Sequence, residues 1–428
     1  MIVVAALPLA VALICDAGAK PAAWAHLGPA GYDTPALGAV ASSGAAQAAA
    51  HLNGTEWLLA TANGGIWHTH DILEKPEPRW TQQLDGAPVA CSSISAMSTA
   101  VAGTVLAGCG AATSSEMGKT WDVANSGDWG GVMLTRDSGQ TWAMVRSNPF
   151  ANLYISSLIV VSPTVFLVGA RSSLHDRSES TGGVWRSADG GATWIKVFSK
   201  PVFDLRYRAP HLLAAVPWAS DEESLYLSPD GGATSTSFVP WSTGLSWGGR
   251  KPFYPTFALG SDVVFMGALT VNPANLSDTS SAIYVRDLAE LDRDLAELDP
   301  PSPPPKGWRA LGRSPRLDQD AMPKDRMALL VHPADDSMLF VAGNAGALTW
   351  RVDWKGGRWT STAGADTSDG SSPHSDCRNY YWEPVTSSLI VLNDGGGHMR
   401  TAPATPGGRW TSLSGDTGAM EFISAACA

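Results

Sequence analysis

Residues 182–194, with the sequence Gly-Gly-Val-Trp-Arg-Ser-Ala-Asp-Gly-Gly-Ala-Thr-Trp, decide the fold of this chain. They contain a short apolar strand, a polar turn and a tryptophan that begins the next strand. Asp and Gly favour tight turns, because Asp bonds the nearby backbone and Gly adopts positive φ angles. The apolar run Phe166-Leu167-Val168 precedes this stretch and supplies a neighbouring strand. The segment therefore predicts antiparallel strands joined by tight turns.

The same unit recurs along the chain, and each copy ends with an aromatic residue. These closing residues are Trp80, Trp142, Trp194, Phe238 or Trp241, Trp308, Trp359 and Trp410. The 330 residues from Trp80 to Trp410 form six intervals of about 55. Propeller blades take ~40–50 residues plus insertions, so the pattern predicts an all-β, seven-bladed β-propeller with loop insertions. A pair of stacked β-sandwiches is the alternative, but it would not require one repeated unit throughout.

The composition excludes several classes of protein. The chain has 428 residues, of which 16% are charged, and a formal net charge of −11. A hydrophobic content of 44% is enough to bury a core, which excludes general disorder. Nucleic acid is not an expected partner, because phosphate contact needs clustered Lys and Arg.

Two identical heptads (286–292 and 293–299) and a proline run (300–305) interrupt the fifth unit, where we expect a surface loop.

The N-terminus predicts export from the cell. Residues 2–15 are apolar, and Ala17-Gly18-Ala19 provides the small residues of a cleavage site. We expect a signal peptide at 1–19, a lead-in at 20–37, the propeller at 38–414, and an extra strand at 415–428. That strand either closes the ring or begins a truncated further blade. The expected location is extracellular or luminal in the secretory pathway, with no membrane contact beyond the cleaved signal. The alternative interpretation of the apolar N-terminus is a short membrane anchor or an incorrectly assigned start of the chain.

The cysteines are consistent with an oxidising compartment. After loss of Cys15 four remain, which allow three pairings. Cys91 and Cys109 fall in consecutive predicted strands and are the expected disulfide, although four buried thiols remain the alternative. The pairing of Cys377 and Cys427 stays open. Cys and His spacings do not suggest zinc, so we expect no metal and no cofactor. Glycosylation sequons begin at Asn53 and Asn275.

Three polar turns share a motif, Ser/Thr-x-Asp-x-Gly-x-Thr, which Trp follows in the first two. Its residues are Asp137, Gly139 and Trp142; Asp189, Gly191 and Trp194; and Asp230 and Gly232. The motif resembles the Asp-box of BNR repeats, found in sialidases, xyloglucanase-type glycoside hydrolases and sortilin-like propellers. The Asp can accept backbone N–H bonds across the turn and the Trp can pack into the next layer, so we expect a structural role and no catalytic one.

The resemblance extends to the C-terminal region. Residues 373–378, Pro-His-Ser-Asp-Cys-Arg, followed by 393–396, Asn-Asp-Gly-Gly, resemble a segment of xyloglucanase- and sortilin-like proteins. Residues 394–400 also resemble the Asp-x-Gly-Gly-x-Tyr-Arg signature in which xyloglucanases place a catalytic Asp, with Met399 replacing the tyrosine. The resemblance implies Asp394 and Asp376 as catalytic acid and base. The alternative is that both carboxylates cap turns by accepting backbone N–H bonds.

Loops of a propeller converge on one face around its central channel, where a ligand would bind. Carboxylates beside aromatic side chains suit sugar chemistry, because an acid and a base flank the glycosidic bond while a ring stacks on the pyranose. The substrate-binding candidates in such loops are His374, Arg378, His398, Trp129, Asp128, Trp218, Glu222 and Trp247.

The resemblance implies a carbohydrate-active propeller of glycoside hydrolase type that acts on or binds a glycan or polysaccharide. Xyloglucanases, however, use a cleft between two propellers, and this chain holds one. The alternative is a non-enzymatic sortilin-like propeller that binds a protein or glycan on its face. A luminal assembly factor similar to the photosystem II stability propeller is a third interpretation, weakened by the lack of an Arg-rich face. A sialidase is disfavoured, because its Arg motif is matched only at 207–210, after two of the Asp-box turns instead of before them.

Overall fold

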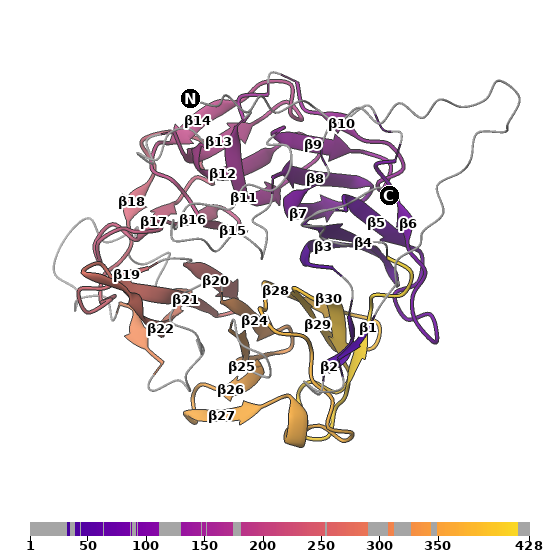
Figure 1. Cartoon of the computed structure of the whole chain (residues 1–428). Coiled ribbons are helices and arrows are strands. Elements are labelled where there is room, and N and C mark those ends of the chain that lie inside the picture. The colour runs from indigo at the N-terminus through magenta and orange to yellow at the C-terminus, as the bar shows by residue number, and fades with distance from the viewer. Residues whose placement is uncertain are drawn as a thin grey trace, which may run out of the picture.

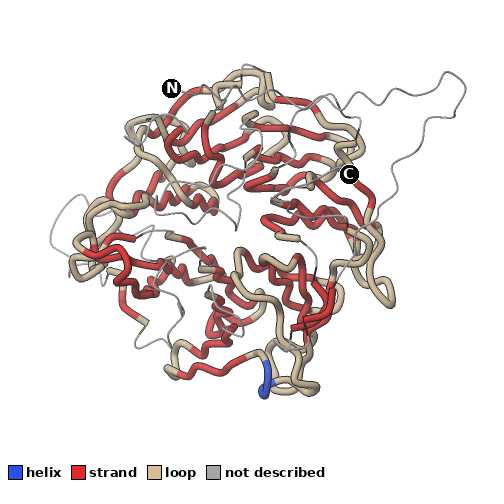
Figure 2. The backbone as a smooth tube through the Cα atoms, viewed as in Figure 1, coloured by secondary structure: helices blue, strands red, loops and turns tan. Residues whose placement is uncertain are grey.

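The structure is an all-β, seven-bladed β-propeller (Figure 1). It is a computed structural model that describes residues 32–34, 39–42, 44–62, 64–85, 87, 91, 93–110, 130–146, 148–150, 152–173, 181–252, 255–289, 307–311, 327–343 and 349–417. Seven antiparallel sheets radiate around a central axis, with loops at their ends and at the periphery (Figure 2). Each sheet consists of strands that are consecutive in sequence. The fold predicted from the repeat is confirmed.

Each blade runs from an innermost strand at the central axis to an outermost strand at the rim. Blade 1 contains β3 (Ala46–Asn53), β4 (Glu56–Thr61), β5 (Ile66–Thr69) and β6 (Thr81–Gln82); blade 2 contains β7 (Ile94–Val101), β8 (Thr104–Cys109), β9 (Val132–Thr135) and β10 (Ala143–Met144). Blade 3 contains β11 (Leu153–Val160), β12 (Phe166–Ser173), β13 (Gly183–Ser187) and β14 (Ile195–Phe198); blade 4 contains β15 (Asp204–Arg208), β16 (His211–Ala215), β17 (Leu225–Ser228) and β18 (Val239–Pro240).

Blade 5 contains β19 (Lys251–Pro252) and β20 (Thr256–Leu259), which both pair with β21 (Val263–Asn272), then β22 (Asn275–Asp287) and β23 (Arg309–Ala310). Blade 6 contains β24 (Ala328–His332), β25 (Asp335–Ala342), β26 (Thr349–Asp353) and β27 (Arg358–Ser361). Blade 7 contains β28 (Asn379–Glu383), β29 (Ser388–Asn393), β30 (Gly396–Arg400) and β31 (Trp410–Ser412), and a 3₁₀ turn (Gly364–Asp366) precedes it. A separate hairpin is formed by β1 (Tyr32–Thr34) and β2 (Ala39–Ser42).

The closing aromatic residues mark the outer strand of each blade. Trp80 and Trp142 directly precede β6 and β10, and Trp410 begins β31. In blade 4 the outer strand β18 lies between Phe238 and Trp241, which explains why the sequence left that ending ambiguous. The aromatic ring fills the wide outer part of the gap between sheets, where a smaller side chain would leave a void.

The three Asp-Gly turns have the same hydrogen-bond pattern. In the turn of blade 2, the Thr135 hydroxyl donates to Asp137 Oδ1 (2.7 Å) and accepts from the Gly139 N–H (3.0 Å). Thr141 donates to the same carboxylate through its N–H (2.9 Å) and its hydroxyl (2.6 Å). The turns at 187–193 and 228–234 repeat these contacts. The Asp side chain thus holds the turn closed, as expected for a structural role.

These hydrogen bonds lower the pKa of all three turn carboxylates, Asp137, Asp189 and Asp230. At Asp189, donation by the Thr193 hydroxyl is the largest cause, and the pKa falls to about 2. At Asp230, burial raises the pKa, but hydrogen bonds from Ser237, Ser228 and Thr234 outweigh it and bring the value to about 2. The ionised carboxylate is therefore part of the folded turn.

The glycine of the first turn allows adjacent blades to approach closely. Gly139 has a φ of 93°, which L side chains rarely adopt, and a Cβ there would lie 3.2 Å from Leu58 of blade 1. The Trp142 indole N–H donates to the Gly139 carbonyl oxygen (3.0 Å), which fixes the ring against the same interface. Leu58 and Trp142 belong to one buried apolar cluster shared by blades 1 and 2. The core of the protein is divided in this way among the interfaces between blades.

The ring closes where blade 7 packs against blade 1. No strand is exchanged at this junction among the described residues, because each blade is formed by one continuous stretch of the sequence. The Trp80 indole N–H donates to the Leu413 carbonyl oxygen (2.8 Å), and its backbone N–H donates to Asp416 (2.6 Å). The hairpin of β1 and β2 lies beside β31 at this junction (Figure 1). Residues 418–428, which include most of the predicted extra strand, are outside the described part of the chain.

Several other sequence expectations concern the chain ends and the cysteines. The predicted signal peptide (1–19) and most of the predicted lead-in (20–37) are outside the described residues, as are 290–306 of the insertion. In the structure Cys91 and Cys109 form a disulfide with a Cα–Cα distance of 5.5 Å, Cys377 is buried, and Cys427 is not described. Within the described ranges, no helix has the length and apolarity required to cross a membrane.

Candidate functional site

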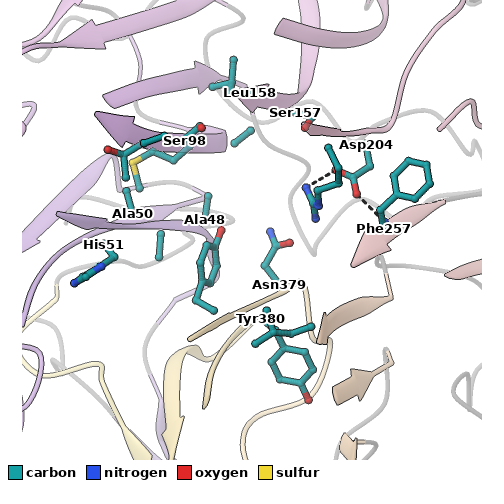
Figure 3. A pocket seen from close by; sticks show the side chains of 18 of the residues that line it. Ala48, Ala50, His51, Ser98, Ser157, Leu158, Asp204, Phe257, Asn379 and Tyr380 are labelled. Atoms are coloured by element: carbon teal, nitrogen blue, oxygen red, sulfur yellow. Dashed lines mark hydrogen bonds and ion pairs between the residues drawn. The ribbon is translucent and has the colours of Figure 1, made fainter. Parts of the chain in front are cut away.

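A central channel of about 750 Å³ runs along the propeller axis. Residues from the innermost strands of all seven blades line it, and most are small or apolar, such as Ala48, Ser98 and Leu158 (Figure 3). Asn379, the first residue of β28, lines the channel, and its side-chain N–H donates to the carbonyl oxygen of Gln47 in blade 1 (2.8 Å). We call the end of the channel at Asn379 the channel mouth.

Asp204 is a channel residue that the sequence analysis did not select. Its carboxylate accepts hydrogen bonds from the Thr256 hydroxyl (3.0 Å), the Phe257 N–H (2.8 Å) and the Arg206 guanidinium (2.8 Å) (Figure 3). Because Thr256 and Phe257 belong to β20, this buried carboxylate joins blade 4 to blade 5. The sequence offered little to single it out, because β15 reads Asp-Leu-Arg-Tyr-Arg and carries two arginines as well as this acidic residue. Because three donors already bind this buried carboxylate, we assign Asp204 a structural role.

The Arg378–Asp394 ion pair lies at the channel mouth. Arg378 directly precedes Asn379, and Asp394 follows β29 in the turn to β30. The Arg378 Nε donates to Asp394 Oδ1 (2.9 Å), and its Nη2 contacts the same oxygen. The side chains are 4% and 14% exposed, respectively. The structure therefore brings together two residues that the sequence placed in separate loops of the last unit.

The turn that carries Asp394 is held by buried polar side chains. The Asn393 side-chain oxygen accepts a hydrogen bond from the Gly395 N–H (2.9 Å), and its amide lies 3.1 Å from His398 Nδ1. Asn393 and His398 are fully buried. The prediction that His398 contacts substrate is therefore wrong, because its ring lies buried inside the blade. His398 instead positions the turn behind Asp394.

Asp376 lies in the short segment that leads into β28. It is half-buried and has a φ of 59°, a left-handed conformation that is uncommon outside glycine. Its neighbour His374 is also half-buried, and the ring Nδ1 lies 3.3 Å from the Ser375 carbonyl oxygen. The N–H of Cys377 donates to the carbonyl oxygen of Gly343 in the loop after β25, which fixes the segment against blade 6. Asp376 and Arg378 thus belong to one constrained turn.

The candidates of blades 4 and 5 have unequal exposure. Trp247 is buried, and its indole N–H donates to the Ser224 hydroxyl (3.2 Å), so it is a core residue and the prediction of a stacking platform there is wrong. Trp218 is half-buried with a φ of 59°, and Glu222 is exposed. Trp218 and Glu222 lie in the loop between β16 and β17. This loop corresponds to the one between β29 and β30 that carries Asp394 in blade 7, so Trp218 and Glu222 lie on the face of the channel mouth. Asp128 and Trp129 lie outside the described residues.

The comparisons with known proteins show the fold. No protein family model and no curated protein sequence matches the chain. The structure is similar to the GH74 xyloglucanase from Xanthomonas campestris (TM-score 0.59, 16% identity), over 88% of this chain and 55% of that one. It is also similar to the GH74 enzyme from Niastella koreensis (0.58, 14%), over 87% and 54%. YCF48 bound to D1 peptide is a third similar structure (0.52, 13%), over 84% and 94%.

These similarities place the chain among the seven-bladed β-propellers. The chain spans about half the length of the two GH74 structures. In the comparison with YCF48, it covers 94% of that chain. At identities of 13–16% the shared property is the arrangement of the backbone. Function has to be argued from the residues at the channel mouth.

Proposed function

We propose that the protein is a secreted, carbohydrate-active β-propeller of the glycoside hydrolase type, which binds a glycan over the channel mouth. The observation that supports the proposal most is the contact between Arg378 and Asp394 at that mouth. The loops that carry these residues are those whose sequences resemble the xyloglucanase segment. GH74 enzymes also share the fold, and the one from Xanthomonas campestris is a xyloglucanase.

The charges at the mouth suggest different roles for the two carboxylates. Asp394 forms an ion pair with the Arg378 guanidinium, whereas Asp376 lies in the separate turn that leads into β28. An ionised carboxylate can accept a proton from water or stabilise positive charge that develops on the sugar ring. Asp376 is then the candidate acid, and Trp218 is the candidate stacking surface. Asp376 and Trp218 have left-handed backbones, a strain that folded proteins retain most often at functional sites.

A second candidate function is binding of a peptide or protein at the same face without catalysis. The specific observation in its favour is the similarity of the fold to YCF48, which was solved bound to D1 peptide, with a TM-score of 0.52 at 13% identity. A sortilin-like propeller would use the same loops, with Arg378 and Asp394 holding the rim of the mouth. No proton transfer would then depend on Asp376.

A glycan array followed by hydrolysis assays on the bound glycans tests the proposal. We expect Asp394→Asn and Asp376→Asn to lower turnover by about 100-fold or more, the usual contribution of a positioned acid or base. Asp85→Asn, which changes an exposed carboxylate of blade 1, is the matched control and should retain full turnover.

Other outcomes separate the two candidates. Glycan binding without hydrolysis would retain the binding function and refute catalysis, whereas peptide-array binding without glycan binding would favour the second candidate. Export is tested separately by N-terminal sequencing of the mature protein, which should begin at Lys20.

A further inference from the structure

Three side chains that commonly bind metal ions lie together at one end of blade 1. Glu56 is the first residue of β4, His68 lies in β5, and His70 directly follows Thr69, the last residue of β5. Trp57 pairs with Thr69 in this antiparallel sheet, so Glu56 lies opposite His70. Residues two apart on a strand share a face, so His68 lies on that face as well. The register thus places two imidazoles and one carboxylate side by side.

The distances within this group are close to those of a metal site. Glu56 Oε1 lies 2.8 Å from His68 Nε2 and 3.4 Å from His70 Nδ1. One potential ligand atom from each residue lies within 4.8 Å of the other two. In a tetrahedral zinc site with bonds of about 2.0–2.1 Å, neighbouring ligand atoms are about 3.4 Å apart. The Glu56–His70 distance already matches this value, and the shorter Glu56–His68 distance is a hydrogen bond that a bound ion would replace.

Neighbouring residues orient the ligands. The Asn53 side-chain amide donates to Glu56 Oε2 (2.5 Å), which leaves Oε1 directed at the histidines. The Thr55 hydroxyl donates to the carbonyl oxygen of His70 (3.3 Å) and restrains the chain that carries this ligand. Hydrogen bonds of this kind fix the orientation of ligands around metal ions.

The exposure of the two histidines also suits a bound ion. His68 is 10% exposed, and its Nε2 lies 2.8 Å from Glu56 Oε1, so a ligand nitrogen and a ligand oxygen face each other in a largely buried position. His70 is 87% exposed, which gives an ion access from solvent and leaves room for a water ligand.

We propose that Glu56, His68 and His70 bind a divalent transition-metal ion, with zinc as the best fit for two imidazoles, one carboxylate and a water molecule. The site is remote from the channel mouth. Strand β3 begins beside Asn379 and ends at Asn53, so the hairpin between β3 and β4 lies at the opposite end of the channel. The inference is therefore independent of the proposed function, and it differs from the expectation from sequence that the chain has no metal site.

Calorimetric titration of the full-length chain with zinc tests the site. The protein is prepared without an affinity tag and without glycosylation at Asn53, and is first treated with a chelator. We expect one equivalent of zinc to bind. His70→Ala should weaken binding by at least about 100-fold, since loss of an outer hydrogen bond alone costs 10–100-fold. Asn53→Ala, which removes that outer hydrogen bond, should weaken binding about 10-fold.

Two variants keep the test decisive. His51→Ala changes a histidine in the same hairpin whose ring contacts the Gly54 carbonyl oxygen (3.0 Å) and is no proposed ligand, so it should bind zinc as the wild type does. Glu56→Gln retains the side-chain shape and should lose most of the affinity. Because His70 is exposed, His70→Ala should fold normally, and circular dichroism checks this. Absence of saturable binding up to about 1 mM zinc, or equal affinity of His70→Ala and wild type, would overturn the proposal.

Discussion

Replacement of Arg378 by methionine tests how the channel mouth is held together. The substitution keeps most of the side-chain volume but removes the cation that contacts Asp394. Arg378 is 4% and Asp394 14% exposed, so the remaining carboxylate would be largely shielded from water without its partner. Breaking a buried ion pair in this way costs about 3–5 kcal/mol. The residual exposure of Asp394 puts the expected cost at the lower end, about 3 kcal/mol.

Urea unfolding of the wild type, Arg378→Met, Asp394→Asn and the double variant measures this cost and the coupling between the residues. We expect a coupling free energy of about 2 kcal/mol, because the double variant leaves no unpaired charge. The matched control is Arg79→Met, since Arg79 pairs with Glu74 on the surface (3.2 Å) and is 83% exposed. An exposed pair contributes less than about 1 kcal/mol. If Arg378→Met were no more destabilising than Arg79→Met, the assignment of a buried pair would fail.

Three further predictions concern stability. Asp230 has a pKa near 2 in the folded state, below its ordinary 3.8, so its contribution to stability is present above about pH 4 and is lost as the pH falls towards 2; the stability advantage of wild type over Asp230→Asn should shrink over that range in acid unfolding curves. The Cys91–Cys109 disulfide joins residues 18 apart, so a Ser/Ser variant should lose about 3 kcal/mol of unfolding free energy, and an unchanged urea midpoint would contradict this. Trp80→Phe removes the hydrogen bond to Leu413 and should cost about 1 kcal/mol, with faster hydrogen exchange at the junction of blades 1 and 7; uniform exchange around the ring would argue against closure at this point.

The candidate site could be predicted only in part. Resemblance to a known segment indicated Asp394 and Arg378, and their loops do meet. His398 and Trp247 were selected for their chemistry, yet both are buried, because burial depends on how the next blade packs against them. The Glu56–His68–His70 group gave no spacing typical of a metal site, since one ligand comes from a neighbouring strand and is brought close by the register of pairing.

The amino-acid sequence by itself determined the number of blades, the order of their strands and the form of the Asp-Gly turns. These features depend on residues within one unit: alternating apolar strands, a glycine that accepts positive φ, and a carboxylate that bonds residues at most four positions away. Only the tertiary structure decided which side chains face the channel, which lie inside a blade, and where the ring closes. Those properties depend on contacts between residues far apart in the chain, such as Trp80 with Leu413 or Asp204 with Thr256, and no pattern within a single unit specifies them.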